Sequence, residues 1–418
     1  MLILAAALIA QITVSQVRQD VSILADDSMH GRLAPSADQK QTANFLAVRL
    51  RAAGITPSFQ TYAMRTVTIA KEAGGFTYEA NGVAKQLDNG EHIGFPFNDW
   101  PRTDTVGPVY HVSFDNIPDT TRYRGAVLIV SSLGDYERMR GWHPAAVFVA
   151  ADIPAANIAR MAARNTTPRV RNPDAGAFLS GVIVRRVADS IPNGARARVW
   201  LKPDVVYEDS VSNVIGIIPG SDPKLRDEYV VLSAHMDHLG MMKPATGPDS
   251  IYNGADDNAS GTAAILEAAI SLARGKAPRR SIMVVFFGAE EQTGWGAKSF
   301  VRTPYIPLSK IKANLNADMV GRPRGDSLWV IGSQELRARN AEGGLTIVDH
   351  AIDPKWPDLT EWSDHAQFKI RNIPYLYFFT GMHEDYHRVT DSADKLNYEM
   401  LARVSRLIAE TALDVANR

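Results

Sequence analysis

The sequence predicts an α/β protein with a mostly parallel or mixed central sheet, flanked by helices and carrying a smaller inserted domain. Two observations support this prediction. From residue 212 onward, short apolar runs typical of buried strands alternate with longer segments of helical periodicity. Residues 107–201 instead hold several short apolar runs separated by Pro, Gly and Asn, which indicates a separate small β-rich or α/β domain.

Length and composition limit the class of protein. The chain has 418 residues, enough for two or three domains, and its apolar and charged fractions of 45% and 22% are those of a globular protein. Its net charge of -1 gives no reason to expect nucleic acid or an anionic membrane surface as a partner. There is no cysteine, so any metal site must use His, Asp and Glu.

The N-terminus carries an apolar run, residues 2–10, of the length found in signal peptides and too short to cross a membrane as a helix. A basic segment before it and a clear Ala-x-Ala site after it are missing. We interpret residues 1–16 as a trimmed or atypical signal peptide, with a buried N-terminal helix as the alternative. This interpretation predicts a periplasmic or secreted protein without a stable membrane anchor.

The rest of the first half divides into a helical segment and a strand-rich segment. Residues 20–54 read as helical, since QTANFLAVRLRAAGI has an amphipathic period that ends at Gly54. From residue 59 to about residue 100 the pattern changes to short strands and turns. We therefore assign residues 17–106 and 202–418 to the main domain and residues 107–201 to the inserted domain.

Six strand-like runs and three helical runs follow in the main domain. The strand-like runs are NVIGIIPG (213–220), YVVLSAH (229–235), SIMVVFF (281–287), IKANLNAD (311–318), DSLWVIG (326–332) and IPYLYFF (373–379). The helical runs are residues 261–275, 295–302 and 398–416.

Several of these predicted strands end in carboxylates and histidines. The strand 281–287 is followed after two residues by Glu290 and Glu291. Alone, such a pair is usually a solvated loop. However, α/β proteins place ligands at the carboxyl ends of their strands, and five such segments along one edge are hard to attribute to chance. The other segments hold His235, Asp237 and His238; Asp256 and Asp257; Asp318; and His383, Glu384, Asp385, Tyr386, His387 and Asp391.

The number and kind of these groups suit a two-metal site. Catalytic zinc takes His nitrogen and carboxylate oxygen and keeps one position open for water. Two metals about 3.5–4 Å apart need a bridging carboxylate. One bridging Asp, with one His and one carboxylate for each metal, makes five ligands, and a sixth carboxylate must take a proton from water. Two adjacent glutamates can divide this work between a ligand and a base.

The chain resembles the co-catalytic di-zinc metallopeptidases of the M28 type. The resemblance rests on SAHMDHLG, NGADDNASG, GAEEQTGWGAKSF, NADMVG, SDHAQF and DYHRVTD, which occur in the family's order from about Asn213 to the C-terminus. Upstream, residues 26–57 look like the family's usual lead-in, and the inserted segment sits where many members carry a protease-associated-type domain. The resemblance implies a zinc-exopeptidase fold and a zinc-dependent exopeptidase acting on peptides, most often an aminopeptidase.

The same resemblance implies a cofactor of two Zn²⁺ ions and five ligands. His235 and Asp318 would bind one ion, and Glu291 and His387 the other. Asp257 would bridge the two, and similar proteins have a cis peptide bond after this residue.

It also implies roles for three residues that are not ligands. Glu290 would be the general base that takes a proton from the attacking water and returns it to the leaving amine. Asp237 would orient the imidazole of His235. Tyr386 would stabilise the oxyanion, with a packed aromatic residue as the alternative. No direct ligand role is implied for His238, Asp256, His365, His383 and Asp385; Asp364 and Asp391 are second-shell or structural, and His30, His92, His111, His143 and His350 are surface or packing residues.

Several alternatives remain open. HEDYH, residues 383–387, matches the H-E-x-x-H motif of zincins and would make Glu384 the base, but that motif needs a helix, and turn-like sequence follows it here. A carboxypeptidase or dipeptidase of the same family is a further alternative; glutamate carboxypeptidase relatives use arginines to bind a substrate carboxylate, and Arg322 and Arg324 are weak candidates here. A single-zinc glutaminyl cyclase and a non-catalytic binding ectodomain are further alternatives. Ligand type alone does not fix the metal as zinc.

We expect the side-chain pocket to be bordered by the loop from Met241 to Ile251 and by the inserted segment.

Overall fold

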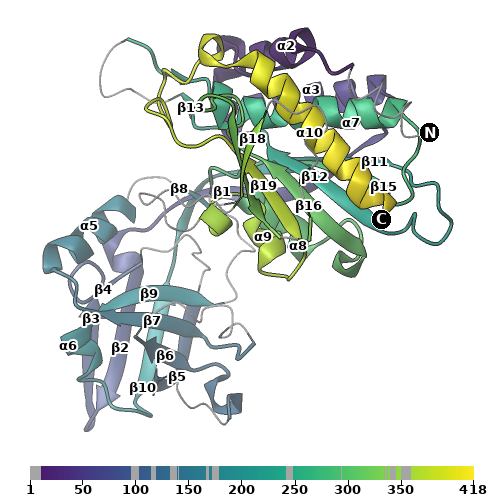
Figure 1. Cartoon of the computed structure of the whole chain (residues 1–418). Coiled ribbons are helices and arrows are strands. Elements are labelled where there is room, and N and C mark those ends of the chain that lie inside the picture. The colour runs from purple at the N-terminus through teal and green to yellow at the C-terminus, as the bar shows by residue number, and fades with distance from the viewer. Residues whose placement is uncertain are drawn as a thin grey trace. The chain divides into compact units, whose positions relative to one another are not determined.

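The computed structural model divides the chain into two compact units, shown in Figure 1. The first unit combines Met1–Tyr62 with Ser210–Arg418, and the second is Ala63–Asp209. Residues 1–10 of the predicted signal peptide, residues 242–247 of the predicted pocket loop and His350 lie outside the described residues. The structure describes residues 11–95, 103–113, 119–131, 139, 141–165, 169–171, 178–241, 248–292, 294–333, 335–336, 338, 345–349 and 359–418.

A mixed sheet forms the centre of the first unit, and all six predicted strands are present in it. The order is β18-β17-β19-β16-β12-β15-β11-β1, followed by β8 (Arg169–Arg171), which pairs with the part of β1 that belongs to the second unit. β12, β15, β16 and β19 are mutually parallel, whereas β11 and β17 run antiparallel to their neighbours. The bounds are β1 Pro57–Thr68, β11 Asp204–Ile218, β12 Tyr229–His235, β15 Ser281–Phe287, β16 Ile311–Ala317, β17 Ser327–Gly332, β18 Thr346–Asp349 and β19 Tyr375–Phe379.

The parallel register brings the carboxyl ends of the central strands to one edge. His235, the last residue of β12, is paired with Phe287, the last residue of β15. On the other side of β12, Asp318 directly follows β16, and its backbone N–H donates to the carbonyl of Phe378 in β19. The segments that follow β12, β15, β16 and β19 therefore start from the same edge of the sheet.

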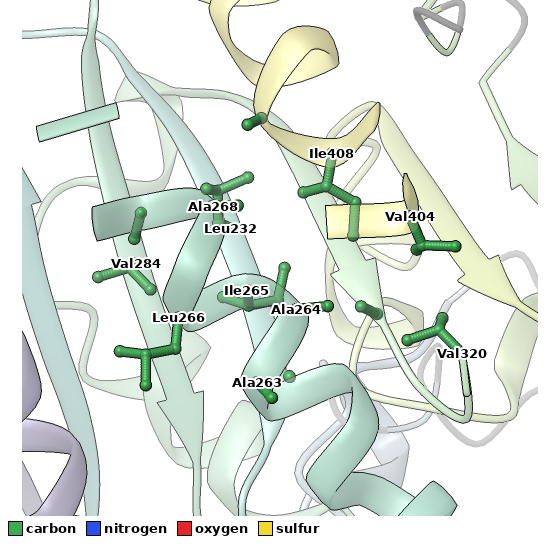
Figure 2. Close-up of a cluster of buried hydrophobic side chains, with 14 of the residues drawn as sticks. Leu232, Ala263, Ala264, Ile265, Leu266, Ala268, Val284, Val320, Val404 and Ile408 are labelled. Carbon is green, nitrogen blue, oxygen red and sulfur yellow. The ribbon is translucent and has the colours of Figure 1, made fainter. Parts of the chain in front are cut away.

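Helices cover both faces of this sheet. Successive side chains of a strand point to opposite faces, so each central strand packs against helices on both sides. On β12, Leu232 belongs to a hydrophobic cluster with helices α7 and α10, whereas Val231 belongs to a cluster with α8. Figure 2 shows the first cluster, in which Ala264 of α7 lies near Val404 and Ile408 of α10. All three predicted helices are confirmed. The helices of this unit are α2 Val14–Leu24, α3 Ala37–Ala52, α7 Gly261–Arg274, α8 Trp295–Arg302, α9 Ala366–Lys369 and α10 Tyr398–Asn417.

The N-terminal helix α2 begins inside the range predicted to be a signal peptide. Thr13 and Gln16 form a reciprocal capping box at its start. The side chain of Ile12 is 2% exposed, and its carbonyl accepts a hydrogen bond from Arg406 in α10. Residues 12–16 are therefore part of the folded unit, as in the alternative of a buried N-terminal helix. Among the described residues, no helix is both long and apolar enough to cross a bilayer.

The segment predicted as one helical region, residues 20–54, is broken in the middle. Helix α2 ends at Leu24 and α3 begins at Ala37, and a 3₁₀ segment, Asp27–Arg32, lies between them. The side chains of Asp26 and Ser36 accept hydrogen bonds from backbone N–H groups two residues ahead, which starts a new turn at each position. Side-chain capping thus overrides the helical periodicity of the sequence.

The second unit is built on its own eight-stranded sheet, ordered β3-β2-β10-β5-β6-β7-β9-β4. It begins at Ala63, not at the predicted residue 107, because β2 and β3 pair next to β10 and bury Phe76 in this unit's core. Residue 107 lies within β5. The bounds are β2 Gly74–Ala80, β3 Val83–Asp88, β4 Ile93–Gly94, β5 Thr103–Val112, β6 Val127–Val130, β7 Ala146–Ala151, β9 Leu179–Val184, β10 Arg196–Leu201, α5 Ala155–Asn165 and α6 Arg185–Ala188.

Candidate active site

A pocket of about 330 Å³ opens at the carboxyl edge of the first unit's sheet. Seven of the eight predicted site residues line it, and Asp237 is buried behind them. The polar residues of the lining are His235, Asp257, Glu290, Glu291, Asp318 and His387, and the other residues are Met319, Trp362, Tyr377, Phe379, Met382 and Tyr386.

Asp257 stands between two groups of candidate metal ligands. Its Oδ1 lies 3.4 Å from Nε2 of His235, which is itself 3.3 Å from Oδ1 of Asp318. Its Oδ2 lies 3.1 Å from Nε2 of His387, which is 3.2 Å from Oε2 of Glu291. One carboxylate thus offers a different oxygen to each histidine, which is the arrangement of a bridging ligand.

His238 joins the second group, although the family pattern implies no direct ligand role for it. Its Nδ1 lies 2.7 Å from Oε1 of Glu291. His238, Asp257 and Glu291 place ligand atoms within 4.8 Å of one another, as do His235, Asp257 and Asp318. The sequence signal was the HMDH spacing, but only the fold shows that His238 turns toward Glu291. Buried imidazoles and carboxylates in these groups fit zinc as a ligand set.

The position of Asp257 follows from the hydrogen bonds of the π-helical turn Ala255–Ser260. The carboxylate of Asp391 accepts the backbone N–H groups of Asp256 and Asp257 at 3.0 and 3.1 Å. The next residue, Asn258, donates to the carbonyl of Ala317 at the end of β16. The Asp257–Asn258 peptide bond is cis, as the resemblance implies.

Asp237 holds the loop that carries the two glutamates. Its carboxylate accepts the backbone N–H of Glu290 at 2.9 Å and that of Glu291 at 3.3 Å. The same carboxylate is 3.8 Å from Nδ1 of His235, and the backbone carbonyl of Asp237 is nearer to that nitrogen, at 3.3 Å. Asp237 therefore orients the glutamate loop by hydrogen bonds and contacts His235 chiefly through its main chain.

The two adjacent glutamates have opposite electrostatic environments. Burial would raise the pKa of Glu291, but His238 and His387 hold it well below its usual value. Burial raises the pKa of Glu290 well above its usual value, and the neighbouring carboxylates Asp364 and Glu291 raise it further, whereas His235 opposes them. Glu291 is thus a stable carboxylate ligand candidate, while Glu290 is a stronger base.

The pKa values of His387 and His235 are both raised. Burial would lower the pKa of His387, but hydrogen bonds to Asp257 and Glu291 raise it to about 10. Burial would likewise lower the pKa of His235, but Asp318, Glu290 and Asp257 raise it well above its usual value. The upward direction of both pKa shifts reflects the negative charge of the carboxylates that converge on the pocket.

Tyr386 lies on the pocket wall and stacks on the ring of His387, with centroids 3.8 Å apart and planes inclined by 22°. Burial raises the pKa of Tyr386 far above its usual value, with Asp257 and Glu291 adding to the shift. Its hydroxyl therefore keeps its proton at neutral pH and remains a hydrogen-bond donor.

The zincin interpretation of HEDYH is wrong. Residues 383–387 form turns and no helix. His383 lies 3.2 Å from Asp256 and 3.0 Å from the guanidinium of Arg322, whereas the side chain of Glu384 is 79% exposed. Arg322 is also ion-paired with Asp385, so its guanidinium is already occupied.

The first unit is similar in sequence to known peptidases. Residues 213–412 match the model of peptidase family M28. Leupeptin-inactivating enzyme 1 of Streptomyces exfoliatus is 31% identical over 193 residues, covering 44% of this chain and 38% of that protein. Probable leucine aminopeptidase 1 of Trichophyton verrucosum is 33% identical over 225 residues, covering 49% of this chain and 58% of that protein. The chain therefore spans less than two thirds of the length of these relatives.

Solved structures share the fold across nearly the whole chain. An aminopeptidase from Aneurinibacillus sp. strain AM-1 has a TM-score of 0.54 at 16% identity and covers 99% of this chain and 96% of that one. A zinc aminopeptidase from Bacillus subtilis has a TM-score of 0.54 at 18% identity, covering 97% and 96%. At these identities the two solved structures show that the chain shares their fold.

Proposed function

We propose that the protein is a zinc-dependent aminopeptidase that removes N-terminal residues from peptides. The observation that carries this proposal is the placement of Asp257, whose two carboxylate oxygens face His235 and His387. In the proposed site, His235 and Asp318 would hold one of two zinc ions, Glu291 and His387 would hold the other, and Asp257 would be the shared ligand. Zinc bound there would polarise the scissile carbonyl and lower the pKa of the attacking water.

Glu290 is the proposed general base. Its side chain lines the same pocket, and its raised pKa makes it a stronger proton acceptor than an ordinary carboxylate. It takes the proton of the attacking water and returns it to the leaving amine. Asp237 keeps Glu290 in place, because it accepts the backbone N–H of that residue.

Tyr386 is the proposed oxyanion donor. It lines the pocket beside His387 and retains its phenolic proton, so it can donate a hydrogen bond to the negative charge that develops on the carbonyl oxygen.

The pocket also suggests a preference among substrates. The lining also includes Trp362, Phe379 and Met382. These residues suit an apolar side chain, and two of the related proteins are named leucine aminopeptidases. We propose an apolar N-terminal residue on the substrate.

The first experiment is hydrolysis of a panel of aminoacyl and dipeptide substrates with free or acetylated amines, after chelation and again after zinc addition. Cleavage only of free-amine substrates, restored by zinc, is expected. Cleavage of N-acetylated peptides that have a free carboxyl terminus would instead indicate the carboxypeptidase alternative. That alternative has little support, because Arg322 is paired with Asp385 and Arg324 donates to the carbonyl of Met382.

Two further alternatives are separated by the same panel. Cyclisation of an N-terminal glutamine with a single bound zinc would indicate a glutaminyl cyclase. Zinc binding without any turnover would indicate a binding ectodomain. A dipeptidase would cleave free dipeptides and spare longer peptides.

Export to the periplasm or the medium is the proposed location, based on the apolar run at residues 2–10. Cell fractionation of the native host tests it, and recovery of the whole protein in the cytoplasm would contradict it.

A further inference from the structure

Arg32 is a buried arginine next to the site that the proposed mechanism does not use. Its side chain belongs to the first unit and the residue is 1% exposed. Burial lowers the pKa of Arg32 to about 10, with nearby carboxylates opposing the shift, so the guanidinium is still cationic at neutral pH. A buried charge is costly unless it is bonded on several sides, so its partners matter.

The hydrogen bonds shown for Arg32 all lead to main-chain carbonyl oxygens. Nε donates to Met236 at 3.0 Å, one terminal nitrogen donates to Leu24 at 2.5 Å and to Asn253 at 2.6 Å, and the other donates to Gly254 at 2.9 Å. The rigid guanidinium fork thus joins three chain segments that are far apart in the sequence.

Two of these segments carry the candidate metal ligands. Met236 lies directly between His235 and Asp237, and Gly254 precedes Asp257 by three residues. Arg32 therefore ties the end of β12 to the turn that holds the bridging carboxylate. Its hydrogen bonds to these carbonyl oxygens limit the spacing of the two segments.

The packing around Arg32 leaves this spacing little freedom. A Cβ on Gly31 would lie 2.4 Å from the carbonyl oxygen of Tyr252 and 2.7 Å from that of Gly240. A Cβ on Gly254 would lie 2.4 Å from the ring of His238 and 2.2 Å from the carbonyl oxygen of Asp257. The backbone segments on both sides of the arginine are thus in close contact.

The positive charge of Arg32 also acts on the carboxylates of the site. The carboxylates that act on it most strongly are Asp237, Asp257, Asp391 and Glu291. Three of these are the candidate bridging ligand, a candidate ligand and the residue that holds the glutamate loop. A fixed cation behind them reduces their mutual repulsion, since charges interact strongly where water is excluded.

We propose that Arg32 is a positioning residue of the metal site, which sets the spacing of the segments around His235 and Asp257 and offsets the repulsion of their carboxylates. This inference rests on the proposed zinc function. It differs from a purely structural role, in which Arg32 would stabilise the fold without any specific effect on metal affinity.

The test compares zinc dissociation constants of the full-length protein by chelator competition, with thermal unfolding of the metal-free samples measured in parallel. Arg32→Lys keeps the charge but loses the fork, and Arg32→Met loses both. Arg49 is the control, because it is paired with Asp20 and Glu267 in the same unit, away from the pocket. Arg49→Lys and Arg49→Met should lower the unfolding temperature and leave zinc affinity unchanged.

We expect Arg32→Met to weaken zinc binding by about 10- to 100-fold, the usual effect of losing a group that orients ligands, with Arg32→Lys in between. Equal zinc affinity in Arg32→Lys and the unchanged protein would overturn the inference, as would an equal loss in the Arg49 variants. Absence of zinc binding by the unchanged protein would instead overturn the proposed function itself.

A second measurement covers the case in which Arg32→Met does not fold. Hydrogen exchange of the metal-free Arg32→Lys protein should be faster in residues 235–238 and 253–257 than in the unchanged protein, with α10 unaffected. Unchanged exchange in both segments would overturn the inference.

Discussion

At the scale of single residues, the site separates the tasks of two neighbouring carboxylates by their surroundings. Glu291 is contacted by His238 and His387, which hold its pKa low. Glu290 is as deeply placed, but burial and neighbouring carboxylates keep its pKa high. A ligand must be ionised and a base must bind a proton readily, so the same residue type serves both tasks.

Replacing Glu290 with glutamine removes the proposed base and keeps the shape of the side chain. We expect Glu290→Gln to retain zinc and to lose activity by about 100-fold or more, the usual contribution of a general base. Activity and metal content measured on the same sample check this. Glu384→Gln, at an exposed position of HEDYH, is the matched control and should remain fully active. Full activity in Glu290→Gln would contradict the assignment.

Asp257→Ala tests the bridging role. Because Asp257 is shared by both ligand groups, its loss should remove the paired site, and fewer than two zinc ions should remain tightly bound. Metal analysis after dialysis gives the stoichiometry. Two tightly bound zinc ions in this variant would exclude Asp257 as the bridge.

The raised pKa values of the histidines predict how zinc binding depends on pH. In the protein without metal, His387 is protonated below about pH 10, and the pKa of His235 is also well above its usual value. Zinc requires neutral imidazole, so binding at pH 8 must release protons. Zinc affinity should therefore increase from pH 6 toward pH 9. Calorimetry in buffers of different ionisation enthalpy measures the release, and proton uptake on binding would contradict the predicted sign.

At the scale of elements, the site depends on turns that follow parallel strands. The backbone of Gly254 has φ +57°, and a Cβ there would collide with the carbonyl oxygen of Asp257. Gly54, at the end of α3, also has a positive φ, but a Cβ there would meet no atom within 4 Å. A comparison of alanine variants at the two positions therefore distinguishes the effect of backbone strain from that of a steric clash.

Gly54→Ala should cost only the strain of a left-handed residue, about 1–2 kcal/mol, and leave zinc affinity unchanged. Gly254→Ala should cost more stability and should also weaken zinc binding, because the turn that carries Asp257 must move. Urea unfolding and chelator competition measure the two effects. Equal behaviour of both variants would show that the turn tolerates a side chain.

Six strands and three helices of the first unit were predictable from the sequence after residue 212, whereas the turns and unit boundaries were not. Strands such as residues 281–287 are buried on both faces and therefore read as continuous apolar runs. The position of residues 63–106 depends on strand pairing with β10, about a hundred residues downstream, which local pattern does not reveal. The proposed ligands followed from motifs, but the contacts of His238 and Arg32 are long-range and have no local signal.

At the scale of the whole molecule, the chain of the first unit is interrupted by the second unit, and yet the first unit has a continuous core. The largest cluster of the first unit combines residues 12–55 with residues 214–416, and the largest cluster of the second unit extends from Val67 to Leu201. Each cluster thus lies within one unit. The hydroxyl oxygens of Thr61 and Ser212 are 2.8 Å apart, so the chain leaves the first unit and re-enters it at neighbouring positions.

This arrangement predicts that the first unit folds without the insertion, since domains with separate cores and adjacent ends tolerate excision. We expect a variant with residues 63–209 replaced by a short Gly/Ser linker to be soluble, to show the helical circular dichroism of the first unit and to bind zinc as tightly as the full chain. Residues 63–209 expressed alone should also fold. This fragment lacks the residues of the proposed zinc site. Aggregation of the shortened chain with linkers of several lengths, or a folded product that has lost zinc affinity, would show that the insertion is needed to complete the metal site.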